Sequence, residues 1–457
     1  TPDARDKDES YSQKTHLIHG RFQSDRWDYR HHVIPPMSAS VTYRLDSTKR
    51  GAMGFTEFGG HTPHQEPIYI YDRLDEPTRG MLEENLAFAE GGDIAVCYAS
   101  GMAAISAAIC ISVRCGEAVV AHHTLYGCTY SLLTRWLPRQ GIRVDLTDCN
   151  EASVLRAALS KPDVRVLYFE TPTNPDLEII DLRQTRAIVD EINQGRPEAE
   201  HVRIIVDNTF ATPYCQRPLS LGAHMVVHSL TKNIGGFGTD MGGVVIAPRS
   251  LELPLMSYRK DFGGVISTRS AWPILVYGLP TLPVRIRQQQ ETALRVARWL
   301  EKHPKIGTVL YPGLDSFPQR ALAEQQMRDF EDRFAPGTMI YFTLKHTGAT
   351  AETGCGDCVA RFVDDLARDS YCITLAVSLG QLRTLIEHPW SMTHSAVTAD
   401  TGSARVDPGG IRLSIGLEKG DDIIHDLGNA LRAFQDCGGA RSSEAPTEAA
   451  NPCGAPV

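Results

Sequence analysis

Short apolar runs rich in β-branched residues alternate with amphipathic helical stretches between about Asp93 and Pro248. This alternation is typical of βαβ units, in which crossover helices join parallel strands. We expect strands at 94–98, 118–121, 164–169, 203–206 and 225–227. Each run ends in polar residues, and open α/β sheets bind ligands beyond the carboxyl ends of their strands. The pattern therefore predicts an α/β fold with a mainly parallel central sheet flanked by helices, and a site at the carboxyl edge of that sheet.

The chain of 457 residues exceeds what one compact core usually organises, so more than one packed unit is expected. The alternation of strand and helix patterns ends near 278–283. A helix is predicted after it, with apolar residues at i, i+3, i+4 and i+7 from Ala293 to Leu300. Beyond it we expect a strand at 338–342, a glycine-rich stretch at 407–416 and a closing helix to about 436. These features predict a second, smaller domain, and the Gly, Ala, Ser, Pro and Glu of 438–457 predict a flexible tail.

The charge balance excludes some partners. The 46 Lys and Arg against 55 Asp and Glu give a net charge of −9, which provides no global positive field for nucleic acid or an anionic membrane. No apolar segment approaches the roughly 18 to 20 residues needed to cross a bilayer. We therefore expect a cytoplasmic protein that binds neither nucleic acid nor membrane.

Cysteine and histidine spacing gives no metal signature. The 11 cysteines are scattered and odd in number, which favours reduced thiols over a disulfide framework. The close pair Cys355 and Cys358 has no second CxxC to complete a zinc site, so a loop or helix start is the better interpretation. The doublet His122-His123 is interpreted as solvated or core histidines. The sequence predicts no metal site.

The most informative segments are 206–213 and 226–236, where an acid ends one strand and a lysine follows the next. Lys232 can form an imine with an aldehyde, while the hydroxyls of Ser229 and Thr231 hold a phosphate. Asp207 can pair with a pyridinium nitrogen and keep it protonated. Each residue alone is a weak signal, but together they describe a site for pyridoxal 5'-phosphate.

These segments, with several others in order along the chain, resemble the Cys/Met-metabolism (transsulfuration) family of pyridoxal-phosphate enzymes of fold type I. That family includes cystathionine γ-synthase, cystathionine lyases, methionine γ-lyase and O-acetylhomoserine sulfhydrylase. The match runs from about Val33 to Asp436. Its other clear blocks are Tyr71-Asp-Arg73, Glu76-Pro-Thr78, 99–105, 124–130, 170–175 and 388–394.

The resemblance implies roles for the cofactor residues. Lys232 is the Schiff-base lysine, Asp207 the partner of the ring nitrogen, and Tyr126 the aromatic ring that stacks on the cofactor and assists the leaving group. The phosphate site implied by the family consists of Ser100, Gly101, Met102, Ser229 and Thr231. The first three open a helix, whose free N–H groups and dipole attract an anion.

The resemblance also implies a site shared between subunits. Tyr71 and Arg73 are similar to the pair that reaches the phosphate of the neighbouring subunit, which implies a dimer as the catalytic unit and commonly a tetramer. The implied organisation is an N-terminal arm and inter-subunit segment over 1–74, a cofactor domain over 75–283, a C-terminal domain over 284–437 and the tail.

For an amino-acid substrate, the resemblance implies that Arg412 clamps the carboxylate bidentately, with Asn174 beside it and Ser378 helping through its backbone. His394 is interpreted as a residue that holds its own turn and is not assigned to catalysis.

Residues expected near the substrate entrance favour two different activities. Cys128 resembles methionine γ-lyase, whereas the segment 236–243 is closer to O-acylhomoserine sulfhydrylases. Arg383 stands where relatives commonly have an acid; it either disfavours a cationic distal amine such as that of cystathionine, or points to solvent. Trp390 stands where the family usually has a small residue, and the segment 51–64 is longer than the corresponding link in the family. Both differences leave the identity of the substrate undecided.

Our first hypothesis is γ-elimination on a sulfur-containing amino acid, giving a 2-oxoacid, ammonia and a thiol. The alternative is γ-replacement by a transferase that uses an O-acylhomoserine, another homoserine-type donor or S-adenosylmethionine. A third hypothesis is a non-catalytic regulatory subunit that binds pyridoxal phosphate. The presence of Lys232, Asp207 and Tyr126, which together serve proton transfer, disfavours it.

Overall fold

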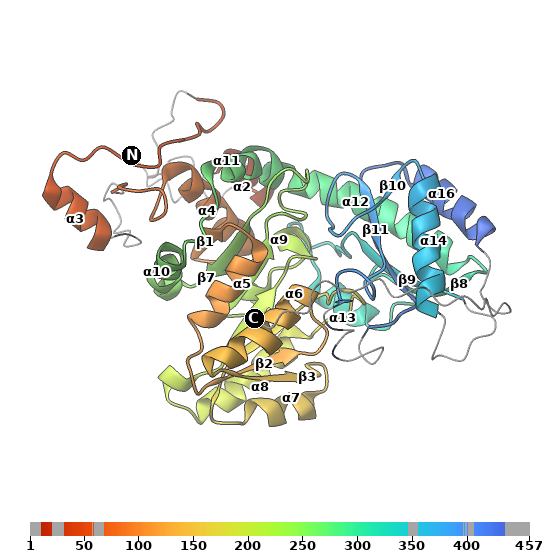
Figure 1. Cartoon of the computed structure of the whole chain (residues 1–457), viewed down its shortest axis with the longest axis horizontal. Helices are drawn as coiled ribbons and strands as arrows, with labels where there is room; N and C mark the ends of the chain where they lie inside the picture. Colours follow the sequence, from red (N-terminus) through yellow and green to blue (C-terminus); the bar gives the residue numbers. More distant parts are fainter. Residues whose placement is uncertain are drawn as a thin grey trace, which may run out of the picture.

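The computed structural model describes residues 11–20, 32–56, 58, 68–345, 355–395, 397, 400 and 406–434. Two sheet-centred parts lie beside each other, joined by the long helix α12 (Leu279–Glu301) (Figure 1). The expected tail at 438–457 and half of the segment 51–64 lie outside the described residues. None of the described helices is both long enough and apolar enough to cross a membrane.

The larger part is built on a seven-stranded sheet of order β1-β7-β6-β5-β4-β2-β3. The strands are β1 (Ile94–Tyr98), β2 (Ala118–His122), β3 (Arg143–Thr147), β4 (Val164–Glu170), β5 (Arg203–Asp207), β6 (Met225–Ser229) and β7 (Gly243–Ala247). Strands β6, β5, β4, β2 and β3 are parallel, while β7 is antiparallel to both of its neighbours. The five expected strands are all present, and the mainly parallel sheet is confirmed.

Two strands, β3 and β7, are additional to those expected. Strand β3 lies at the edge of the sheet and is only half-buried, because Arg143 and Asp145 alternate with its apolar residues. Strand β7 is fully buried but runs against its neighbours after the turn that carries Lys232. A regular βαβ pattern does not predict such a returning strand.

Helices cover both faces of this sheet because its strands are apolar on both sides. On β4, Val166 and Tyr168 pack in the core that includes α5 (Gly101–Cys110) and α10 (Glu252–Phe262). Leu167 and Phe169 pack in the core of the other face, with α7 (Ala152–Leu159) and α8 (Leu182–Gln194). The alternating directions of β4 side chains thus join two cores through one strand.

Polar residues at the carboxyl edge begin the helices next to it. The Ser100 side chain accepts a hydrogen bond from Ala103 N and caps α5. Glu76 is buried, accepts from the Thr78 and Arg79 amides and caps α4 (Pro77–Glu90). Glu76 therefore starts a helix here, and burial raises its pKa to about 7.

The smaller part contains a five-stranded sheet of order β10-β11-β12-β9-β8. The strands are β8 (Ile306–Leu310), β9 (Met339–Leu344), β10 (Ile373–Leu375), β11 (Thr384–Glu387) and β12 (Gly410–Ser414). Its core is shared with α12, α14 (Cys355–Asp369) and α16 (Gly420–Ala433), which lie together over the sheet in Figure 1. This arrangement confirms the smaller C-terminal α/β domain.

The remaining α-helices of the described chain are α2 (Gln13–His19), α3 (Thr48–Thr56), α6 (Gly127–Ser131), α9 (Thr212–Cys215), α11 (Thr268–Pro273) and α13 (Arg320–Gln326). A further helix, η1 (Leu132–Trp136), continues α6.

Candidate active site

The polar ends of β4, β5 and β6 lie at one cavity of about 270 Å³, which we call the active-site cavity. Both parts of the molecule contribute to it. It is lined by Ser100, Gly101, Met102, Ile105, Tyr126, Glu170, Pro172, Asn174, Asp207, Thr209, Phe210, Ser229, Thr231, Lys232, Met241, Val377, Ser378, Leu379, Thr393 and Arg412. Most of the residues singled out in the sequence therefore lie around one space.

Lys232 lies in the turn after β6, and its Nζ donates a hydrogen bond to Ser378 Oγ at 2.9 Å. Burial and, to a smaller extent, the positive charge of Arg412 lower the pKa of this amine to about 8, while Glu387 opposes the shift. A lowered pKa increases the neutral, nucleophilic fraction of a lysine near neutral pH.

Asp207 ends β5 as a partly buried acid. Its Oδ1 accepts from Thr209 N at 2.9 Å, and its Oδ2 accepts from the Tyr168 hydroxyl at 3.4 Å. Burial raises the pKa of Asp207, and the hydrogen bonds from Thr209 oppose that shift. Asp207 has no ion-pair partner among the described residues.

The start of α5 approaches the end of β6 very closely. A Cβ on Gly101 would lie 2.9 Å from Ser229 Cβ and 3.1 Å from Ser229 Oγ, so glycine keeps this gap open. The free N–H groups of the first turn of α5, with Ser100 and Ser229, face the same space. The Thr231 hydroxyl contacts the backbone of Gly242, which ties the turn to the start of β7.

Tyr126 stands before α6, and its backbone N–H donates to Glu170 Oε1 at 2.7 Å. Burial raises the pKa of the Tyr126 hydroxyl, and the nearby Cys128, Glu170 and Glu387 raise it further. Burial likewise raises the pKa of Glu170 well above its usual range, with Asp207 adding to the shift. The Tyr126 hydroxyl therefore keeps its proton at neutral pH and is a donor.

Arg412 lies on β12 and is almost fully buried at the other end of the cavity. Its Nη1 donates to Asn174 Oδ1 at 2.7 Å, and its Nη2 donates to the Ser378 carbonyl at 3.0 Å. The same Nη2 lies 2.9 Å from Glu387 Oε1 in a buried ion pair. The remaining guanidinium donors can serve a carboxylate in the cavity.

Sequence reasoning missed several of these residues. Glu387 was not assigned, although it directly precedes the matched block 388–394. Glu170 begins the matched block 170–175, but the sequence assigns it no role. Thr209 and Tyr168 hold Asp207 but carry no signal of their own in the sequence.

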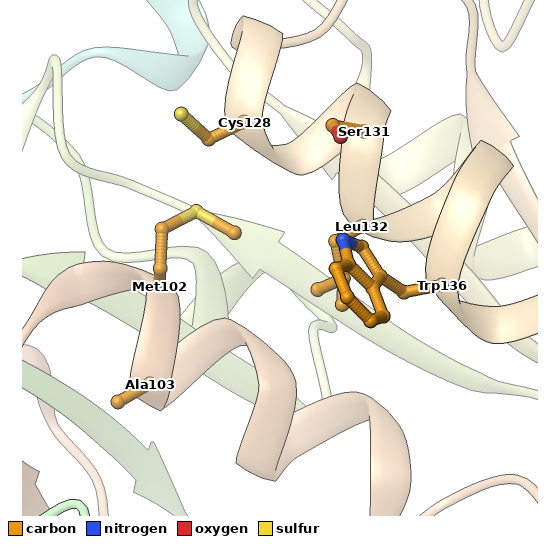
Figure 2. A pocket seen from close by; sticks show the side chains of 6 residues that line it. All are labelled: Met102, Ala103, Cys128, Ser131, Leu132 and Trp136. Atoms are coloured by element: carbon orange, nitrogen blue, oxygen red, sulfur yellow. The ribbon is translucent and has the colours of Figure 1, made fainter. Parts of the chain in front are cut away.

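An apolar hollow of about 410 Å³, the outer cavity, shares Met102 with the active-site cavity. Its lining consists of Met102, Ala103, Cys128, Ser131, Leu132 and Trp136. In Figure 2, Met102 rises from α5 toward Cys128 on α6, and Leu132 and Trp136 lie on η1. Cys128 thus borders the outer cavity rather than the active-site cavity.

Four other residues singled out in the sequence line neither cavity. Tyr71 and Arg73 lie at the surface, where the Arg73 guanidinium sits 5.6 Å from the Tyr71 ring and also bonds the Lys260 carbonyl. Arg383 is exposed, which agrees with the interpretation that it points to solvent. Trp390 packs against the core around α5 instead of lining the active-site cavity.

The histidine doublet forms a cluster that is unsuited to a metal. Ligand atoms of His122, His123 and Asp148 lie within 4.8 Å of one another. The Cys149 amide donates to His122 Nδ1 at 3.1 Å, so a neutral His122 ring must carry its proton on Nε2. That N–H faces Glu178 Oε2 at 3.3 Å and is not available as a ligand.

Seven of the described cysteines agree with the expectation of reduced thiols. Free thiols are present at Cys97, Cys110, Cys115, Cys128, Cys149, Cys215 and Cys372. Cys358, in contrast, is disulfide-bonded, which corrects the expectation at that position. The expected helix start is found, because α14 begins at Cys355.

The active-site cavity fits pyridoxal 5'-phosphate. Among the described residues the partly buried Asp207 forms no ion pair, and a protonated ring nitrogen would provide a cation for it. The gap kept by Gly101 at the start of α5 suits a phosphate, and Lys232 is a partly buried amine of lowered pKa. A two-part α/β fold with this cavity defines the class of pyridoxal-phosphate-dependent enzymes.

Comparison with known proteins identifies the family. The family model described as Cys/Met metabolism PLP-dependent enzyme matches residues 14–432, and the chain belongs to this family. An L-methionine gamma-lyase of Porphyromonas gingivalis is 39% identical over 402 residues, which cover 87% of this chain and 92% of that protein. An O-acetyl-L-homoserine sulfhydrylase of Leptospira meyeri is 32% identical, covering 94% of this chain and 99% of that protein.

The fold agrees with this assignment. The solved structure of cystathionine gamma synthase from Xanthomonas oryzae pv. oryzae superposes with a TM-score of 0.77 at 32% identity, covering 92% of this chain and 98% of that one. The chain is therefore a pyridoxal-phosphate-dependent enzyme of the lyases and transferases that act on sulfur amino acids.

Proposed function

We propose that the enzyme catalyses γ-elimination on methionine or a similar thioether amino acid, releasing a 2-oxoacid, ammonia and a thiol. The observation that carries this proposal is the meeting of a base, a proton donor and a carboxylate-binding arginine at one cavity: Lys232, Tyr126 and Arg412. The similarity to L-methionine gamma-lyases supports the choice of reaction.

Bound pyridoxal 5'-phosphate supplies a ring that withdraws electrons from the substrate's amino carbon. The residues that would hold it are Lys232 for the aldehyde, Asp207 for the ring nitrogen, Tyr126 for the ring face, and Ser100, Gly101, Met102, Ser229 and Thr231 for the phosphate.

γ-Elimination removes an α proton and a β proton from the substrate and gives one proton to the leaving sulfur. The Lys232 amine, held by Ser378 Oγ, would take the α proton and then a β proton in its neutral form. The Tyr126 hydroxyl keeps its proton because its pKa is raised, and it can protonate the departing sulfur. Arg412 with Asn174 would bind the substrate carboxylate and so orient the α C–H bond toward Lys232.

The outer cavity supports a thioether as the leaving group. Its lining is apolar apart from Ser131, so it suits an uncharged sulfur substituent better than the distal ammonium of cystathionine. It adjoins the active-site cavity at Met102. The alternative proposal is γ-replacement, in which the same space admits a thiol nucleophile; the similarity to the sulfhydrylase of Leptospira meyeri favours it.

Product analysis separates the two reactions. The purified enzyme is incubated with L-methionine, and separately with O-acetylhomoserine with and without a thiol. A 2-oxoacid and thiol released from methionine without any nucleophile supports elimination. A new γ-substituted amino acid that forms only with the thiol supports replacement, and no turnover of either substrate would contradict both.

We further propose that the site is completed by a second subunit, in a catalytic dimer that pairs into a tetramer. Tyr71 and Arg73 are exposed and lie outside the cavity of their own chain, which supports a contact with another copy. Mixing Arg73→Ala and Lys232→Ala proteins should restore activity in hybrid dimers. Absence of activity despite demonstrated subunit exchange would contradict the shared site.

We propose the cytoplasm as its compartment, because seven of the described cysteines are free thiols. Cell fractionation tests this; recovery of the protein outside the cytoplasmic fraction would contradict it.

A further inference from the structure

The turn 388–394 of the smaller part reaches across to the larger one. Its residues Thr393 and His394 are the last of the turn, and Thr393 lines the active-site cavity. A Cβ on Gly127 would lie 2.1 Å from the Thr393 carbonyl oxygen, so the backbones of α6 and this turn are in close contact. His394 is almost fully buried, and its Nε2 lies 3.0 Å from the Asn174 carbonyl oxygen.

The contact with Asn174 fixes the protonation of the His394 ring. A carbonyl oxygen only accepts, so Nε2 carries the proton and donates it. Burial and, to a smaller extent, the charge of Arg412 lower the pKa of His394 to about 4, so the ring is neutral at neutral pH. Nδ1 then carries no proton and lies 3.0 Å from Thr393 Oγ1.

Thr393 and His394 hold the two side chains that flank Arg412. The Thr393 hydroxyl donates to Glu387 Oε1 at 2.8 Å, and Glu387 is the ion-pair partner of Arg412. His394 holds the backbone of Asn174, whose side-chain Oδ1 accepts from Arg412 Nη1. One turn therefore fixes both neighbours of the guanidinium.

We propose that Thr393 and His394 are positioning residues for the substrate carboxylate, which set how strongly the enzyme prefers an amino acid over its uncharged amide. The proposal rests on the proposed function only in that the substrate is an α-amino acid. Without the His394 donor, Asn174 is free to move away from Arg412, and the guanidinium loses the orientation that a bidentate carboxylate contact needs.

The turn itself contains a matched control. His388 is as buried as His394, but its ring contacts Ser391 Oγ at 2.9 Å and the Pro408 carbonyl at 2.8 Å. Both partners belong to the smaller part of the molecule. Replacing His388 therefore disturbs the turn without removing a contact to Asn174.

The test measures binding to the holoenzyme of L-norleucine, which has a carboxylate but no sulfur, and of L-norleucinamide, from changes in cofactor absorbance. For His394→Phe we expect norleucine to bind about tenfold more weakly, and the amide to change by less than about twofold. His394→Gln retains a donor and should recover most of the loss. For His388→Phe we expect an unchanged ratio of the two affinities.

Equal weakening of both ligands in His394→Phe, or the same change of the ratio in His388→Phe, would overturn the proposal. If His394→Phe does not fold, Thr393→Val removes only the hydroxyl, and we expect a loss of about threefold in the ratio; an unchanged ratio would overturn the proposal as well. Because norleucine carries no leaving group, these outcomes are independent of whether the enzyme eliminates or replaces.

Discussion

The two ends of the active-site cavity are built in different ways. The cofactor end comes from strand ends and turns of one sheet, with Asp207, Ser229 and Lys232 within a short stretch of chain. At the carboxylate end, Arg412 of the smaller part meets Asn174 of the larger part. The first end follows from local sequence, whereas the second exists only when the two parts pack together.

The two ends also differ in how their charges are balanced. Asp207 has no cation beside it among the described residues, so the cofactor end is completed by its ligand. Arg412 is already paired with Glu387 inside the protein. We therefore expect changes at the cofactor end to affect chemistry first, and changes at the carboxylate end to affect stability and substrate binding.

The largest effect should come from Lys232→Ala, which removes the base. We expect kcat to fall by about 10³-fold or more, since a positioned general base alone contributes up to about 10⁴-fold. Steady-state kinetics on a variant shown by circular dichroism to be folded checks this. Lys161→Ala, at an exposed ion pair with Asp145, is the control and should keep its activity. Normal turnover in folded Lys232→Ala would refute the assignment.

At the carboxylate end, Arg412→Met should reduce the free energy of unfolding by about 3–5 kcal/mol, because it leaves the buried Glu387 unpaired. Urea denaturation measures this loss. Adding Glu387→Leu to the same protein should recover much of it. An Arg412→Met protein as stable as the wild type would mean that Glu387 is not held by this pair.

Asp207→Asn tests whether Asp207 pairs with a protonated ring nitrogen of the cofactor. The amide cannot stabilise a protonated ring nitrogen, so we expect kcat to fall by about 10²-fold while the cofactor still binds. Visible absorbance and kinetics are measured on the same sample. Asp207→Glu keeps the charge and should retain more activity than the amide; equal activities would argue against the ion pair.

The loss of stability in acid should depend on His224, which lies outside the active-site cavity. His224 accepts from Ile204 N at 2.9 Å, and burial lowers its pKa to about 4. The unfolded chain therefore takes up this proton first, and stability falls as the pH drops from about 6.5 to about 4. His224→Gln should reduce that fall by about 1–3 kcal/mol in urea denaturation at pH 7 and pH 4.5. The same fall in the variant would assign it to other groups.

The smallest expected effect concerns loading of the cofactor. With a Lys232 pKa of about 8, the rate at which the apoenzyme binds pyridoxal phosphate covalently should rise about tenfold between pH 7 and pH 9. Stopped-flow absorbance measures this rate. Pyridoxine 5'-phosphate, which lacks the aldehyde, should bind without this rise, and an equal rise for both compounds would mean that the lysine is not responsible.

At the cofactor end, the lysine after β6 and the acid at the end of β5 follow from strand ends in the sequence, and both line the cavity. Ser100, which the resemblance implies, lines it too. Less could be predicted at the carboxylate end. Asn174 and Arg412 were placed by resemblance alone, and the Glu387, Thr393 and His394 contacts were not predicted.

The sequence by itself determined the alternation of strands and helices and the polar residues at the strand ends, because periodicity and turn chemistry act over a few residues. The family followed from its resemblance in motifs that lie in order along the chain. Only the tertiary structure decided that Arg383 faces solvent, that Cys128 borders a separate apolar hollow, and that one turn holds both neighbours of Arg412. Arg412 and Asn174 lie 238 residues apart in the chain. Their contact depends on how two hydrophobic cores pack together, and no local pattern in the sequence encodes that packing.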